Sequence, residues 1–208
     1  MSVHLAGDIE VSLACHTPRS MAWGRQKDDY FDSLAWVALL MCSTDRAQLD
    51  LPTPCAAFTV RQLMGHLVGT AHRGLGTAQG TSTRHIPHVV TDVADDELAA
   101  TYSALAKQIE AAWATWQAED EGTAPWGVTS ARAAARGFTV ETVTHGWDLA
   151  VATGQPAHLD AVAQRCLETA GPEIVPARLR GVMYDPPHAT QEDSATERLV
   201  HLLGHRRR

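Results

Sequence analysis

A long helix is predicted by residues 130–154, which read SARAAARGFTVETVTHGWDLAVATG. Ser130 is a good N-cap residue, and Gly154 followed by Pro156 is a typical signal for the end of a helix. At about 1.5 Å per residue this helix would be about 36 Å long. We expect it to be one of the long helices of a bundle.

Helical periodicity also occurs in three other long segments and in two short ones near the C-terminus. Thr59 and Gln62 form a capping box at the start of the second segment, which we expect to lose order around Gly74. No segment alternates convincingly enough for a strand, so the expected fold is all-α: a four-helix bundle with additional short C-terminal helices. The expected helices cover residues 30–42, 59 to about 74, 92–118, 130–153, 158–170 and 192–203.

The length of 208 residues is that of one domain of ordinary size. Residues 1–29 show no sustained periodicity, so we expect a mobile or loosely docked N-terminal extension and one helical domain over residues 30–208. Hydrophobic residues make up 45 % of the chain and charged residues 20 %, which excludes disorder over most of its length. We expect a monomer or a homodimer.

Charge and apolar content exclude several classes of partner. The formal net charge of −7 argues against a general grip on nucleic-acid phosphates, and we expect Arg206–Arg208 to be a solvated tail. No stretch approaches the roughly 18 apolar residues of a membrane span, and no secretory signal is recognisable, so the expected location is cytoplasmic. Because no export signal is recognisable, we expect the four cysteines to be reduced; they include no CxxC pair and are Cys15, Cys42, Cys55 and Cys166.

Glu141 and His145 lie four residues apart, which places both side chains on one face of the predicted helix. Gly137, Phe138 and Leu149 on that face are small or apolar, so we expect the pair to point inward. A buried carboxylate costs several kcal/mol unless something compensates for it. Two explanations are open at this point: a Glu–His pair that only stabilises the helix, and two ligands of one metal ion.

His66 lies on the expected inward side of the second helix, between Leu63 and Leu67. A single histidine in a core usually bonds to a backbone carbonyl, but a bundle also brings inward groups of two helices together. Two imidazoles and one carboxylate form a typical catalytic metal set with positions left for water or substrate. These donors suit Zn²⁺ first, and also Ni²⁺ or Fe²⁺.

Two motifs resemble a known family. Thr53-Pro54-Cys55 with residues 58–67, FTVRQLMGHL, is similar to the TPC-x-x-W/F-TV-R-x-L-x-x-H segment of the DinB/YfiT-like metal-binding superfamily. Residues 145–156, HGWDLAVATGQP, resemble the HGWDLA-x-ATGQP motif of its actinobacterial branch, which is related to mycothiol-dependent maleylpyruvate isomerase. The resemblance covers roughly residues 30–205.

The resemblance implies a DinB-like bundle that holds a divalent metal. Carried over by position, it places His66, Glu141 and His145 on the three metal-ligand positions of the thiol-dependent isomerases. It also implies a small-molecule substrate and mycothiol, a low-molecular-weight thiol that the metal activates for transfer or isomerisation. The isomerase's C-terminal domain has no clear counterpart in this sequence, so maleylpyruvate itself is not the expected substrate.

Other residues have open roles. Asp148 either orients a ligand histidine or bonds back to the backbone, and Trp147 is expected to pack in the core. The arginines that could bind an anionic substrate or cofactor are Arg73, Arg132 and Arg136, and the histidines expected on the surface or in loops are His72, His85 and His88.

Two alternatives to a thiol-dependent enzyme remain at this stage. One is a metalloenzyme of secondary metabolism that acts without a thiol. The other is a metal-binding or stress-response protein that catalyses nothing, since a bundle of this kind need not be an enzyme.

Overall fold

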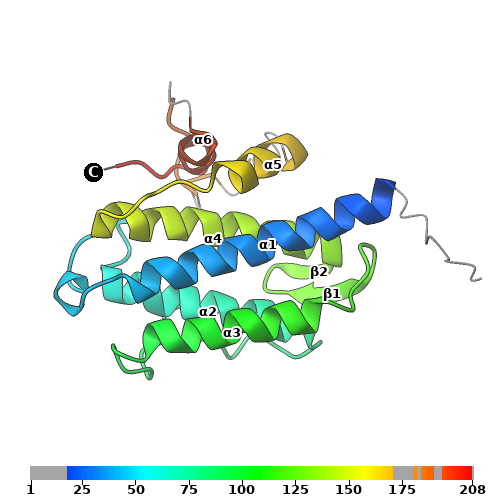
Figure 1. Cartoon of the computed structure of the whole chain (residues 1–208), viewed down its shortest axis with the longest axis horizontal. Helices are drawn as coiled ribbons and strands as arrows, with labels where there is room; N and C mark the ends of the chain where they lie inside the picture. Colours follow the sequence, from blue (N-terminus) through cyan, green and yellow to red (C-terminus); the bar gives the residue numbers. More distant parts are fainter. Residues whose placement is uncertain (1–17, 171–179, 182–183, 190–193, 208) are drawn as a thin grey trace, which may run out of the picture.

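The computed structural model describes residues 18–170, 180–181, 184–189 and 194–207. Four long helices form a bundle in which α1 and α4 run in one direction and α2 and α3 run in the other; α1 and α2 each contact both α3 and α4 (Figure 1). Two shorter helices, α5 and α6, pack on each other and on the outer side of α4. The elements are α1 (Pro18–Cys42), the 3-10 helix η1 (Arg46–Gln48), α2 (Val60–Ala78), α3 (Leu98–Trp113), β1 (Glu121–Ala124), β2 (Gly127–Ser130), α4 (Ala131–Thr153), α5 (Asp160–Ala170) and α6 (Ala195–Leu202).

The start of α2 and both ends of α4 are those that the sequence predicts. The Thr59 side chain accepts a hydrogen bond from the Gln62 backbone N–H, and the Gln62 side chain accepts one from the Thr59 backbone N–H. Ser130 caps α4, and Gly154 ends it in the left-handed conformation at φ 71°. The all-α bundle with short C-terminal helices is therefore confirmed.

The prediction that the first helix begins at Tyr30 is wrong, because α1 begins at Pro18. Within the stretch assigned to the extension, Trp23 is buried and its indole N–H donates to the Trp116 carbonyl at 2.8 Å. Asp29, which lies in the middle of α1, pairs with Arg165 on α5. Residues 1–17 of the expected extension lie outside the described residues.

Three other local predictions are corrected. The second helix keeps its order through Gly74 and ends at Ala78, and the third begins at Leu98 rather than at Asp92. Residues 121–130, expected to contain no strand, form a two-stranded antiparallel hairpin. Its strands have four residues each, too few for alternation to be visible in the sequence.

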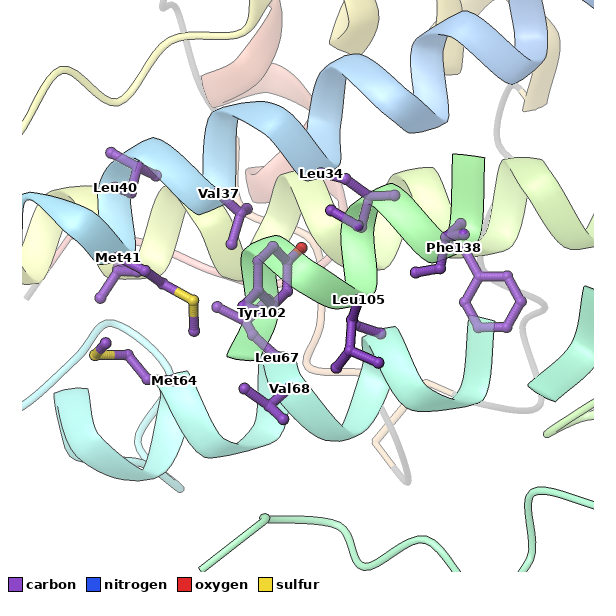
Figure 2. Packing of buried hydrophobic residues seen from close by; sticks show 14 of the residues in the cluster. Leu34, Val37, Leu40, Met41, Met64, Leu67, Val68, Tyr102, Leu105 and Phe138 are labelled. Carbon is purple, nitrogen blue, oxygen red and sulfur yellow. The ribbon is translucent and has the colours of Figure 1, made fainter. Parts of the chain in front are cut away.

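The core lies between the four long helices. Figure 2 shows apolar side chains of α1, α2, α3 and α4 directed into one shared interior. A smaller cluster, which includes Val143, Val162 and Leu199, joins α4 to α5 and α6. No helix in the described part of the chain is long and apolar enough to cross a membrane. The helix α4 is thus packed on both sides, and its middle turns carry the site described next.

Candidate metal centre

Two helices bring together three side chains of types that can bind a metal ion. Glu141 and His145 are one turn apart on α4, and the carboxylate Oε1 lies 3.6 Å from His145 Nε2. His66, from α2, places its Nε2 3.1 Å from the same oxygen. One ligand atom from each residue lies within 4.8 Å of the others. The convergence expected from helix geometry is therefore present in the structure.

The Nδ1 atoms of His66 and His145 are each hydrogen-bonded to an acceptor. His66 Nδ1 lies 3.0 Å from the backbone carbonyl oxygen of His88, and His145 Nδ1 lies 2.9 Å from Asp148 Oδ2. A carbonyl or a carboxylate only accepts hydrogen bonds, so each Nδ1 carries the proton. In a neutral ring the Nε2 atom then keeps its lone pair, and both lone pairs face Glu141.

This arrangement requires positive charge at its centre. Two Nε2 lone pairs and a carboxylate repel one another unless a proton or a metal ion lies among them. When protons on the rings supply this charge, burial still acts to raise the pKa of Glu141, but the charge of His145 and the hydrogen bond from His66 outweigh it and lower the pKa to about 2. Burial acts to lower the pKa of His145, but Glu141 and Asp148 outweigh it and raise the pKa. The donor set therefore matches a divalent cation in charge as well as in atom type.

The three side chains differ in their access to solvent. The His66 and His145 side chains are 7 % and 11 % exposed, whereas that of Glu141 is 35 % exposed. Rings flank the buried side: Phe58 stacks on His66 at 5.0 Å between ring centres and meets His145 edge-on at 6.1 Å. The site is thus most exposed at Glu141, and Phe58 packs against both histidine rings.

His88 belongs to the surroundings of the site although it lies in an exposed loop, as expected. Its ring meets that of His66 edge-on at 4.6 Å, and its backbone carbonyl holds His66 Nδ1. Burial, followed by the nearby charges of His66 and Arg73, lowers the pKa of His88. His85 is exposed and His72 is half-buried beside Asp92, so neither joins the three donors.

The three candidate arginines are placed differently. Arg73 donates to the carbonyls of Ile86 and Pro87 at 3.1 and 2.7 Å, and it lies within electrostatic range of Glu141. The partners of the other two lie elsewhere: Arg132 approaches Glu119 at 3.5 Å, and Arg136 donates to the Thr169 carbonyl at 3.3 Å. Only Arg73 of these three is brought near the metal-binding set.

Asp148 is fully buried and uses both carboxylate oxygens. Its Oδ2 accepts from His145, and its Oδ1 accepts from His205 Nδ1 at 2.9 Å. Burial acts to raise the pKa of Asp148, but these two hydrogen bonds outweigh it and lower the pKa. Of the two roles open for Asp148, the contact with a candidate ligand histidine is the one observed. Cys55 also lies here, since its Sγ is within 4.8 Å of ligand atoms of His145 and Asp148.

The segment after α6 was not expected at the site. Arg207, assigned to a solvated tail, donates to Glu197 Oε1 at 2.6 Å and lies over the Trp147 ring at 5.6 Å. Trp147 is fully buried, as expected, and its indole N–H donates to the same Glu197 oxygen. No motif in the sequence marks His205 or Arg207, because only the fold brings them against α4.

One comparison with known proteins identifies a family for this chain. A family model described as the mycothiol maleylpyruvate isomerase N-terminal domain matches residues 33–150, which is more than half of the chain. The matched stretch contains His66, Glu141, His145 and Asp148 and ends before His205. Neither the curated proteins nor the solved structures gave a match.

Proposed function

Because the chain belongs to the mycothiol maleylpyruvate isomerase N-terminal domain family, we propose that it is a divalent-metal-dependent enzyme acting on a small electrophilic molecule. The ligands proposed for the metal are His66, Glu141 and His145. The nucleophile proposed first is mycothiol, a low-molecular-weight thiol, whose attack would give a transfer or, if the thiol is eliminated again, an isomerisation. The alternative nucleophile is a water molecule, as in a thiol-independent metalloenzyme.

One observation carries the proposal: the Nε2 atoms of two buried histidines converge on one carboxylate while their Nδ1 atoms are held by other acceptors. A helix-stabilising Glu–His pair does not account for this geometry, because His66 comes from a different helix. Two imidazoles and one carboxylate are typical of catalytic zinc sites and also suit Ni²⁺ and Fe²⁺. Zn²⁺ is therefore the first metal to test.

A divalent cation bound by these residues would lower the pKa of a thiol or of a water molecule and so supply a nucleophile near neutral pH. Three residues would support this chemistry by admitting, attracting or shielding the reactants: Glu141, Arg73 and Phe58. Glu141 marks the most exposed side, where a small molecule can enter. Arg73, close enough to act on the charge of Glu141, would attract an anionic group of a substrate or thiol to that side. Phe58 shields the histidine rings from water.

The ligand assignment is tested by metal analysis of the purified protein after reconstitution with Zn²⁺. We expect about one Zn²⁺ per chain in the wild type and a sharp loss in His66→Ala and in His145→Ala, with most of the helix content retained by circular dichroism. His85→Ala is the matched control, because this histidine is exposed in a loop and should leave the metal content unchanged. Full metal content in both ligand variants would refute the assignment.

The reaction is tested with the Zn²⁺-loaded protein and a panel of epoxides, enones and alkyl halides, with and without mycothiol. Conversion that requires both thiol and metal supports the proposal. Conversion without thiol that is lost on chelation would instead indicate a thiol-independent metalloenzyme. Metal binding without any conversion would favour a non-enzymatic metal-binding protein.

A further inference from the structure

We infer that His205 is a positioning residue for the metal centre: it orients Asp148, which in turn holds His145. The inference rests on the proposed metal site, but it concerns a residue outside the matched family segment. Its basis is a continuous hydrogen-bonded chain from His145 Nδ1 through both oxygens of Asp148 to His205 Nδ1, with both contacts at 2.9 Å.

The buried carboxylate at the centre of this chain has two imidazole donors. Asp148 is fully buried, and His145 and His205 each hold one of its oxygens. A carboxylate held at only one oxygen can rotate about its terminal bond, whereas donors at both oxygens fix its plane. The fixed plane of Asp148 directs the His145 ring so that its Nε2 faces Glu141.

The backbone places His205 at this position through a glycine turn at the end of α6. The N–H of Gly204 donates to the His201 carbonyl, and the N–H of His205 donates to the Val200 carbonyl at 2.9 Å. These two bonds form a Schellman motif. Gly204 has φ +94°, and a Cβ there would lie 2.7 Å from atoms of Asp185, so the turn requires glycine.

Residues before and after the turn in the sequence hold it in place. Before the turn, the backbone N–H of His188 donates to the His201 carbonyl at 2.9 Å, and its ring Nε2 donates to the Gly204 carbonyl at 3.1 Å. After it, Arg207 pairs with Glu197 and covers the Trp147 ring. These hydrogen bonds and ion pairs fix the position of His205 relative to α4, so its contact with Asp148 is not an incidental surface pair.

The experiment measures Zn²⁺ affinity by competition with a chromophoric chelator and records the visible spectrum of the Co²⁺-loaded protein, which reports ligand geometry. We expect His205→Ala to raise the Zn²⁺ dissociation constant about threefold to tenfold, less than the 10–100-fold typical for a residue in direct contact with a ligand. The Co²⁺ bands should also shift. His205→Asn, whose amide can still donate to Asp148, should restore both readouts to near wild-type values.

Arg206→Ala is the control, because Arg206 is an exposed neighbour in the same segment. Thermal unfolding of each metal-free variant shows whether a change in affinity merely follows a loss of structure. Wild-type affinity and an unchanged Co²⁺ spectrum in His205→Ala would overturn this inference alone. Failure of the wild-type protein to bind Zn²⁺ would overturn the proposed function, and this inference with it.

Discussion

Tyr30 offers a sharp test of the packing between α1 and α2. Its hydroxyl is buried and has no hydrogen-bond partner among the described residues, and it lies against the α2 backbone at Gly74. An unsatisfied buried polar group costs about 1–3 kcal/mol. Tyr30→Phe removes that cost and keeps the ring contacts with Trp113 and Phe138. We therefore expect this variant to be about 1 kcal/mol more stable than the wild type, which raises Tm by about 2–4 °C.

The same hydroxyl determines the effect of a second substitution. A Cβ at position 74 would overlap the Tyr30 oxygen, but its next neighbours, Tyr30 Cζ and Ile109 Cδ1, lie at ordinary contact distances of 3.4 and 3.7 Å. Gly74→Ala alone should therefore destabilise the protein by about 1–2 kcal/mol through overpacking. In the Tyr30→Phe background it should instead stabilise by about 1 kcal/mol, because alanine is the better helix former.

Urea unfolding of the metal-free protein, followed by circular dichroism, measures all four members of this cycle. The expected coupling between the two positions is about 2–3 kcal/mol, well above the 0.3–0.5 kcal/mol scatter of independent sites. Two results would refute the reasoning: a Tyr30→Phe variant that is less stable than the wild type, or a Gly74→Ala effect of the same sign in both backgrounds.

Three further predictions concern the metal centre and the docking of α5. Asp148→Asn should weaken Zn²⁺ binding about 10–100-fold, measured by chelator competition; unchanged affinity would exclude a role in orienting His145. Zn²⁺ affinity should fall as pH is lowered, because protons compete with the metal for His145 Nε2. The fall should begin above pH 6.5, the ordinary pKa of histidine, because Glu141 and Asp148 outweigh burial and raise the pKa of His145. A pH-independent affinity between 6 and 8 would contradict this. Asp29→Ala should cost at most about 1 kcal/mol in urea unfolding, since Arg165 is 31 % exposed, and a loss that persists in 1 M salt would contradict an ion-pair origin.

Predictions from the sequence are correct where nearby residues determine the structure. The bounds of α4 were predicted because Ser130 can cap a helix with its own hydroxyl and Gly154 can adopt a left-handed backbone. The approach of His66 to Glu141 was predictable because an inward position on each of two helices follows from periodicity alone. That these residues bind metal stays a prediction.

Predictions from the sequence are wrong or missing where tertiary contacts override local preference. The first turns of α1 contain few apolar residues, and Trp23 is stabilised by a carbonyl that lies far along the chain. Gly74 suggested the end of α2, but its missing side chain makes room for Tyr30 inside the helix pair. His88 and His205 reach the site from a loop and a C-terminal turn, and neither segment has a periodicity that would indicate it.

The turn at Gly204 also has a consequence for biosynthesis. His66, Glu141 and His145 leave the ribosome well before His205. A nascent chain thus contains all three proposed metal ligands before His205, the residue proposed to orient Asp148. If the proposed site binds Zn²⁺, a chain truncated just before Gly204 should still bind the ion but release it faster than the full-length protein.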